Sequence, residues 1–445
     1  MVTLNTKNMQ NQSNLLKSKR FLPLFITQFF GAFNDNVFKN AFLIWFTYDV
    51  AQKLNMNAQI MVTVASGLFI LPFFLFSALA GQLADKYEKS KLVQIIKIAE
   101  ILIMGFSFIG FYFENIYLLL TLMFLMGVHS TFFGPIKYSL LPEHLKDREL
   151  VSGNALIEGG TFLAILLGTI IGGITIRIEN GIEIISIAVV FFAIIGWLSS
   201  RFISKAPVGD QNLKISFNIL SQTRKIINYA KKENTVWLSI IGISWFWFIG
   251  VTFLSQFPIY TKNIVSGNEY IVTLFLSIFS IGIGIGSVMC NKLLKGKIDG
   301  RLVPFGSIGI TIGIIIFCTA SYFYNLSITP DHLLGLKEFL SVNIYSWLII
   351  LGLLTIAVFS GIYIVPLYAI MQHRSEGKYL SRIIAANNVL NALFMVISSI
   401  SVVVLFKINF SLLQIFLLVG IINIFVFFTI KKIVKQKISG RLENA

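Results

Sequence analysis

The stretch RFISKAPVGDQNLKISFNILSQTRKIINYAKKE, Arg201–Glu233, decides the fold, because it is a hydrophilic segment between two long apolar regions. It contains seven basic residues. Runs of about 20 apolar residues, the length that crosses a ~30 Å hydrocarbon layer, start near residues 22, 59, 92, 116, 151 and 182 before it and near residues 235, 269, 302, 343, 383 and 411 after it. The chain is therefore predicted to be an all-α membrane protein with twelve transmembrane helices in two six-helix halves.

The composition agrees with this prediction and excludes a soluble core. The 445 residues are 56% apolar and 13% charged, and the mean hydropathy is +0.80. We expect a tail at 1–20, helical bundles at 21–200 and 235–430, a middle loop at 201–234 and a basic tail at 431–445. A plan of two six-helix halves is typical of transporters whose site lies near the midplane between the halves.

The basic residues predict the topology. Of 36 Lys and Arg, 28 fall in segments on one predicted side of the membrane, 5 on the other, and 3 inside apolar runs. Since basic loops stay in the cytoplasm, both termini and the middle loop should be cytoplasmic in a bacterial inner membrane. The net charge of +16 therefore reflects topology rather than nucleic-acid binding. No cleaved signal peptide is expected.

The first apolar run contains FNDNVFKN, Phe33–Asn40, which places charges deep in the membrane. At ~1.5 Å per residue, Asp35 lies roughly 20 Å from Leu22, and Lys39 follows one turn later on the same face. One interpretation is a cavity wall, with Asn36 nearby, where Asp35 meets a cation and Lys39 an anion. The alternative is an ion pair that holds helices together. We favour the cavity, because apolar residues could replace a packing pair at little cost.

The next helices hold further charged candidates. Lys137 could bind phosphate, pair with Glu158 in the fifth helix, or extend to the membrane surface. Pro135 removes a backbone donor and should kink the fourth helix, which would redirect Lys137. His129 is a candidate substrate contact, although a hydrogen-bonded packing role is favoured. Lys97 and Glu100, spaced i, i+3, are interpreted as a structural pair.

The second half offers aromatic and amide side chains instead of charges. The candidate contacts are Gln256, Tyr363, Asn387 and Asn391. A charged wall that faces an aromatic wall suits an amphipathic substrate better than a sugar. The glycines at 168, 172, 282, 284 and 286 are interpreted as sites of close helix packing. The two cysteines have no metal-ligand partners nearby in the sequence, and no metal site or cofactor is predicted.

Several stretches resemble a known family. Residues 81–86, GQLADK, resemble the signature between the second and third helices of the major facilitator superfamily, with Glu88 where a glycine is usual. Asp85 and Lys86 in this signature, together with Pro135, are expected to take part in conformational change. More specifically, the chain is similar to the lysophospholipid transporter family, and most to the transporter module that some bacteria fuse to an acyltransferase and an acyl-carrier-protein synthetase. The matching stretches are QFFGAFNDN (28–36), STFFGPIKY (130–138), GNALIE (153–158), YIVPLY (363–368) and AANN (385–388).

This resemblance implies a major facilitator fold that moves lysophospholipids, chiefly lysophosphatidylethanolamine, from the outer to the inner leaflet. It implies binding roles for Asp35, Lys137 and Glu158. Some family members have an arginine in the seventh helix where this chain has Phe253-Leu254-Ser255, so contacts in the second half differ. The fused enzymes are absent, and reacylation would need a separate acyltransferase or acyl-carrier-protein synthetase.

Two alternatives remain open at this point. Another facilitator, such as a drug exporter or a nutrient permease, would share the fold. Residues 168–173, GTIIGG, loosely resemble the antiporter motif of the fifth helix, but Thr169 stands where proline is usual. A membrane-embedded acyltransferase is disfavoured, because none of the four histidines has an aspartate five residues on. The chain is therefore predicted not to be an enzyme.

The topology can be tested with single cysteines in a variant that lacks Cys290 and Cys318. Because the loops near Lys53 and Lys337 are predicted to face outward, cysteine at either position should react with a membrane-impermeant thiol reagent in intact spheroplasts. Labelling of cysteine at position 214 instead would invert the predicted orientation.

Overall fold

The computed structural model describes residues 14–50, 53, 58–328 and 330–435, and within them twelve long helices follow the predicted runs. Those before the middle segment are α2 (Leu22–Trp45), α3 (Ala58–Lys86), α4 (Lys89–Tyr112), α5 (Ile116–His144), α6 (Asp147–Thr175) and α7 (Gly181–Ser200). Those after it are α9 (Asn234–Asn263), α10 (Glu269–Leu294), α11 (Leu302–Ser327), α13 (Ile344–Arg374), α14 (Leu380–Lys407) and α15 (Leu412–Ile430). Each begins within four residues of its predicted start, so the all-α fold class is confirmed.

Eleven helices among the described residues are long and apolar enough to cross a membrane. The exception among the twelve is α2, whose apolar run is interrupted by Asn34, Asp35, Asn36 and Lys39. It still packs between α6 and α7 in the first half. The polar residues of α2 are therefore held at membrane depth by the surrounding bundle, where lipid alone would not satisfy them.

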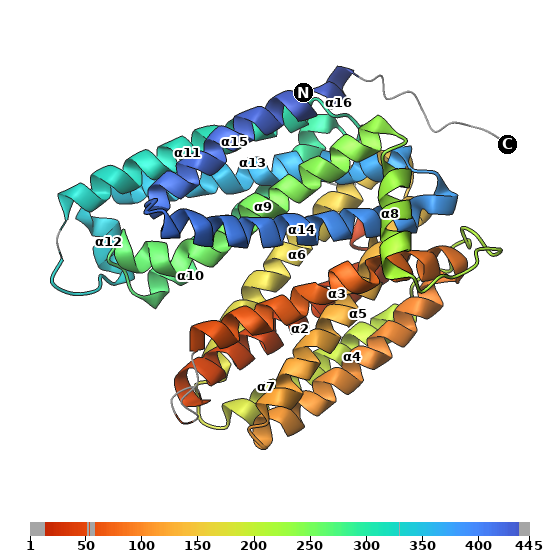
Figure 1. Ribbon diagram of the computed structural model, residues 1–445, viewed down its shortest axis with the longest axis horizontal. Coiled ribbons are helices and arrows are strands. Elements are labelled where there is room, and N and C mark those ends of the chain that lie inside the picture. The colour runs from red at the N-terminus through yellow and green to blue at the C-terminus, as the bar shows by residue number, and fades with distance from the viewer. Residues whose placement is uncertain (1–13, 51–52, 54–57, 329, 436–445) are drawn as a thin grey trace.

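The helices form two bundles that lie side by side (Figure 1). In the first half α2 packs on α6, α3 on α5 and α4 on α7, while in the second half α10 and α11 pack on α13, and α9 on α14. The halves meet along two seams, α6 with α10 and α3 with α14. Gly286 allows one close approach inside the second half, because a Cβ there would lie 1.9 Å from the Val358 carbonyl oxygen.

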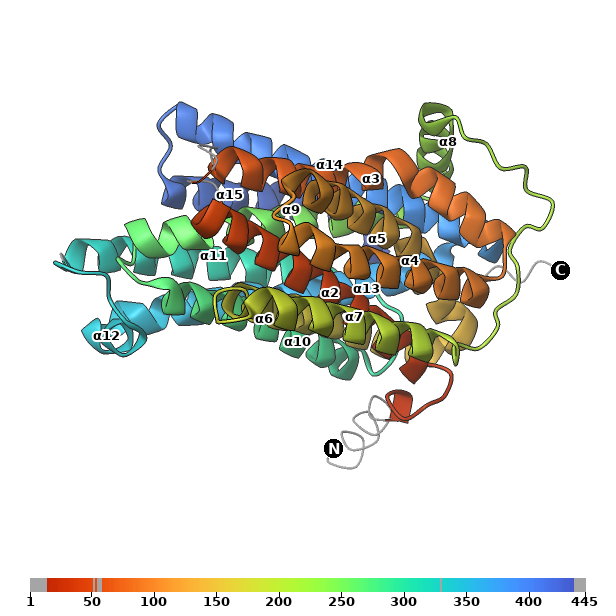
Figure 2. The same cartoon turned by 90° about the horizontal axis from the view of Figure 1, so that it is seen from below.

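Shorter elements lie at the ends of the bundle. The middle segment contains an amphipathic helix that was not predicted, α8 (Ile219–Ala230), which crosses over the ends of α3 and α14 (Figures 1 and 2). We call the end that holds α8 the basic end. The opposite end carries α12 (Leu336–Val342) and the π-helical turn Phe46–Val50. The remaining short elements are a 3-10 turn, Gly377–Tyr379, and α16 (Lys432–Lys435).

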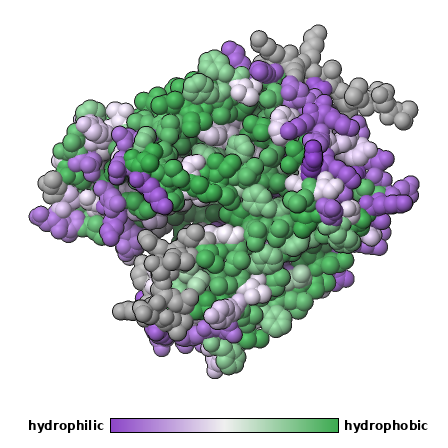
Figure 3. Space-filling model, viewed as in Figure 1, coloured by the Kyte–Doolittle hydropathy of each residue, from purple (hydrophilic) through white to green (hydrophobic). Residues whose placement is uncertain are grey.

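The surface is hollowed between the two halves. Figure 3 shows a recess with apolar walls that opens toward the end with α12, while the surface between the halves is continuous toward the basic end. In this view the recess lies between the two halves at the end away from α8 (Figures 1 and 3).

Candidate functional site

Asp35 and Lys39 do not pair with each other, although they lie one turn apart on α2. Both side chains are half-buried. Asp35 Oδ2 accepts a 2.6 Å hydrogen bond from the Ser130 hydroxyl of α5, and Oδ1 has no hydrogen-bond partner among the described residues. Lys39 Nζ lies 5.9 Å from the centre of the Phe69 ring. Neither residue therefore has an ion-pair partner among the described residues, and the unpaired Asp35 oxygen is itself buried.

The amides beside Asp35 have structural partners. Asn36 Nδ2 donates to the Ala32 carbonyl of its own helix at 2.8 Å. Gln28, which the sequence places on the face of Asp35, is buried and accepts a hydrogen bond from Thr161 of α6. In this structure Asn36 and Gln28 support α2, and only Asp35 and Lys39 of this segment offer charge.

A buried polar network lies inside the first half, and it includes Asn34, the residue before Asp35. Lys97 Nζ lies 2.5 Å from Glu100 Oε2, so the predicted pair is present. Glu100 also accepts a 3.1 Å hydrogen bond from Asn34 Nδ2, and His129 Nε2 lies 3.1 Å from Glu100 Oε2. Lys97 and Glu100 are fully buried, and His129 is 5% exposed. The network joins α2, α4 and α5, and it places His129 in packing rather than on the recess surface.

Lys137 and Glu158 are close in the fold but form no ion pair within 4 Å in the described part of the chain. Lys137 is half-buried, and its Nζ lies 4.5 Å from the centre of the Tyr138 ring. Glu158 is fully buried, and its Oε1 accepts a 2.5 Å hydrogen bond from the Tyr138 hydroxyl. The sequence analysis did not identify Tyr138, although it follows Lys137 directly.

The four candidate residues of the second half occupy different environments. Asn387 is fully buried, and neither of its amide atoms has a hydrogen-bond partner among the described residues. Gln256 is 9% exposed with an unpaired Oε1. Asn391 accepts a hydrogen bond from Ser244 of α9. Tyr363 is buried within the second half, since a Cβ on Gly242 of α9 would lie 3.1 Å from its hydroxyl.

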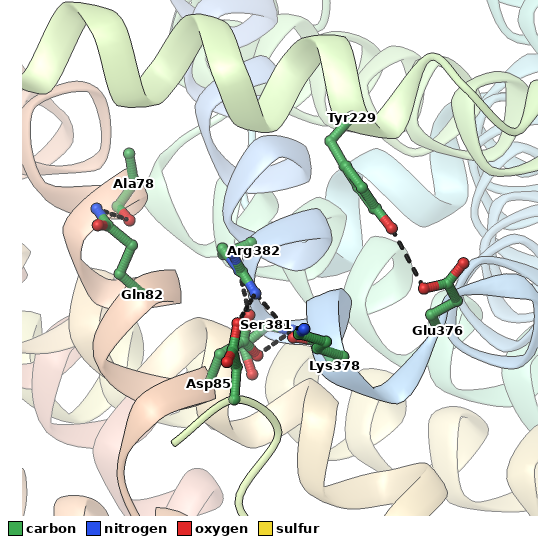
Figure 4. Close-up of polar contacts among 9 residues, drawn as sticks. Ala78, Gln82, Asp85, Tyr229, Glu376, Lys378, Ser381 and Arg382 are labelled. Atoms are coloured by element: carbon green, nitrogen blue, oxygen red, sulfur yellow. Dashed lines mark hydrogen bonds and ion pairs between the residues drawn. The ribbon is translucent and has the colours of Figure 1, made fainter. Parts of the chain in front are cut away.

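Polar contacts close the basic end. Asp85 of α3 accepts hydrogen bonds from Arg382 Nε at 2.7 Å and from the Ser381 backbone N–H at 3.0 Å, both from α14 (Figure 4). Deeper inside, Asn154 of α6 and Gln372 of α13 exchange two amide hydrogen bonds of 2.6 and 3.1 Å. Contacts of this kind must break before the basic end can open.

The other two residues expected to take part in conformational change lie beside this closure. Lys86 is half-buried, with Nζ 5.9 Å from the centre of the Tyr87 ring. Pro135 is buried inside α5, next to Gly134. A Cβ on Gly134 would lie 2.7 Å from Asn388 Nδ2, so α5 and α14 approach closely there. Arg382, Asn154 and Gln372 were missed, because partners on opposite halves share no local sequence signal.

Two six-helix halves around a recess that is open at one end and closed at the other define a membrane transporter. The chain matches the family described as Major Facilitator Superfamily over residues 24–399, and it belongs to that superfamily. Its members are transporters and not enzymes, and this chain is a multi-pass membrane protein.

Curated relatives and solved structures agree with this assignment. The chain is 25% identical over 369 residues to the lysophospholipid transporter LplT of Serratia proteamaculans (strain 568), covering 81% of this chain and 82% of that protein. It is also 25% identical over 365 residues to LplT of Escherichia coli O1:K1 / APEC, with the same coverage.

The solved structures support the fold alone. The human organic anion transporter MFSD10 superposes with a TM-score of 0.70 at 10% identity, over 92% of this chain and 99% of that one. The transporter FucP in the outward conformation gives 0.68 at 9% identity, over 94% and 99%.

If Asp35 contacts a substrate cation, Asp35→Asn should abolish transport while leaving folding and membrane insertion nearly intact, because the amide is almost isosteric. Transport can be measured in reconstituted vesicles, with membrane insertion checked on the same preparation. Normal transport by Asp35→Asn, or rescue by an added Lys39→Met, would make Asp35 a packing residue.

Removal of Glu100 should destabilise the first half. Glu100→Leu leaves the Lys97 ammonium buried without a counter-charge, which typically costs about 3–5 kcal/mol in the free energy of unfolding. The double variant Lys97→Met/Glu100→Leu should recover most of that loss. Denaturant unfolding in micelles measures the free energy of unfolding of the single and the double variant. Glu114→Gln is the control, because Glu114 forms an exposed ion pair with Lys53 and its loss should have little effect. An equal loss of unfolding free energy in the single and double variants would contradict the interpretation of Lys97 and Glu100 as a structural pair.

Proposed function

We propose that this protein is a lysophospholipid flippase that moves lysophosphatidylethanolamine from the outer to the inner leaflet of a bacterial inner membrane by alternating access. The observation that carries the proposal is the unsatisfied charge on α2, where a buried carboxylate oxygen of Asp35 has no partner among the described residues and Asp35 forms no ion pair with Lys39. Similarity to the LplT proteins supports the same substrate class.

A zwitterionic head group fits this charge arrangement. Its ammonium would pair with Asp35, and its phosphate would accept hydrogen bonds from Lys39 or Lys137. Charge-assisted bonds of this type contribute roughly 1.5–3 kcal/mol each. A sugar carries no charge to offset the desolvation of these side chains, so the recess should bind it poorly.

Aromatic side chains at the contact between the two halves suit a single acyl chain. Phe162 stacks on Trp247 across the two halves at 6.1 Å between ring centres, and Phe246 meets Phe162 edge-on. One apolar chain can lie against such a surface, whereas a diacyl lipid must bury about twice the apolar area in the same space.

The position of the recess supports the proposed direction. It opens at the end opposite to the basic end (Figure 3), and the basic end is the side predicted to be cytoplasmic. Substrate would therefore be taken from the outer leaflet. The delivered lysolipid would need reacylation by a separate acyltransferase or acyl-carrier-protein synthetase.

Purified protein in vesicles of known orientation should move labelled lysophosphatidylethanolamine inward and move the diacyl form poorly. Lys137→Met should lose lysolipid flipping, because the phosphate loses its charge-assisted bond. A labelled sugar and a cationic drug serve as control substrates. Equal flipping of mono- and diacyl lipids would indicate a scramblase, and drug-dependent proton exchange without lipid movement would indicate an exporter.

A further inference from the structure

Two tyrosines from opposite halves meet near the basic end. Tyr138 of α5 and Tyr368 of α13 stack with ring centres 4.5 Å apart and planes only 5° from parallel. Both rings are buried, and each lies six residues before the end of its helix at the basic end. The stack therefore joins α5 to α13 close to the polar contacts at the basic end.

One hydrogen bond ties this stack to a charged group. The Tyr138 hydroxyl donates to Glu158 Oε1 at 2.5 Å, and Glu158 Oε2 has no partner in the described part of the chain. A buried carboxylate with one hydroxyl donor is poorly satisfied, since its two oxygens can accept about four hydrogen bonds. Glu158 would therefore be stabilised by a stronger donor that reached it from the recess.

Other polar groups surround the stack. The Trp247 indole and the Asn387 amide interact with the Tyr368 hydroxyl. Neither group reaches good hydrogen-bond geometry with another described residue, so these contacts are weak. Buried polar groups in native proteins are normally well paired, and a polar ligand would therefore find donors and acceptors here.

We propose that Glu158 and the Tyr138–Tyr368 stack form a second head-group subsite, in which the substrate ammonium takes Glu158 from the Tyr138 hydroxyl and thereby releases the Tyr138–Tyr368 contact that keeps the basic end closed. This inference rests on the proposed function, since it assigns the subsite to the head group of the same lysolipid.

The chemistry of each group supports the exchange. An ammonium offers Glu158 a charge-assisted hydrogen bond, which is stronger than a bond from a neutral hydroxyl. The phosphate can draw Lys137 Nζ away from the Tyr138 ring, with loss of a cation–π contact. Asn387 can accept from the ammonium, and Trp247 can donate only to the phosphate. Tyr138 has then lost both its hydrogen-bond acceptor, Glu158, and the Lys137 cation near its ring, and it can separate from Tyr368.

The subsite makes opening depend on the ammonium and not on the phosphate alone. A lysolipid that has phosphate but no ammonium, such as lysophosphatidic acid, can bind Lys137 but leaves the Tyr138–Glu158 bond in place. It should therefore occupy the recess without opening the basic end. Head-group selection would then occur at the conformational step as well as at binding.

Opening can be read from a cysteine at position 385. Ala385 of α14 is fully buried at the basic end, where a Cβ on Gly81 of α3 would lie 2.8 Å from its side chain. In an Ala385→Cys variant that lacks Cys290 and Cys318, reaction with a polar maleimide in micelles requires α3 and α14 to separate. Lysophosphatidylethanolamine should raise the labelling rate several-fold, and lysophosphatidic acid at a concentration that competes for binding should not.

Tyr138→Phe tests the hydrogen bond while keeping the aromatic stack. Without the hydroxyl, the stack no longer depends on Glu158, so labelling should be several-fold faster without ligand and should no longer distinguish the two lipids. Glu158→Gln should lose the effect of lysophosphatidylethanolamine on labelling. The matched control is Tyr260→Phe, a buried tyrosine whose hydroxyl lies 2.6 Å from that of Ser321 inside the second half, and it should respond like the parent.

The outcomes separate this inference from the proposed function. If lysophosphatidic acid opens the parent as well as lysophosphatidylethanolamine does, or if Tyr138→Phe labels like the parent, the gating subsite is wrong while the flippase proposal stands. If the parent neither binds nor moves lysophosphatidylethanolamine, the proposed function fails first. Should Tyr138→Phe not fold, the comparison of the two lipids in the parent still decides.

Discussion

The constraint on which the rest of the structure depends is the cost of charge in a membrane interior. Each ionised side chain at the centre of a transmembrane helix costs roughly 2.5–3.5 kcal/mol on insertion scales, so each must find a partner or a polar space. The first half solves this in two ways. Lys97 and Glu100 neutralise each other and are tied to Asn34. Asp35 and Lys39 instead remain partly exposed, and neither forms an ion pair with another described residue.

The same constraint explains where the halves hold together. At the basic end they are joined by polar pairs near the surface, Asp85 with Arg382, and by the reciprocal amides of Asn154 and Gln372. Such bonds hold firmly while they exclude water, yet their net contribution is modest, about 0.5–1.5 kcal/mol for a neutral pair. The pair Asp85 and Arg382 can exchange its contacts for water when the ends separate. The closure is therefore stable without being permanent.

The sequence predicted the elements well because apolar length is a local signal. All twelve long helices, the packing glycines 168, 172, 282 and 286 and the Lys97–Glu100 pair follow from spacing alone, whereas a Cβ on Gly284 would meet only one atom, 4.0 Å away. The amphipathic α8 was missed because its polar face made the middle segment resemble a loop. Contacts between halves were missed for a different reason. Tyr138 lies more than 200 residues from Tyr368, and Asp85 lies more than 200 residues from Arg382. No local sequence pattern identifies the partner of any of these residues.

The depth of each contact decides what can replace it during transport. The Lys97 network is internal to one half, so it can move as a unit and needs no new partner. Asp85 lies at the end of α3, where water can enter as the halves part. Glu158 differs from both, because it is fully buried and its only hydrogen bond, among the described residues, comes from a tyrosine that contacts the opposite half. A buried carboxylate that loses its donor without a replacement is costly. Movement at this point therefore favours a ligand that brings its own cation.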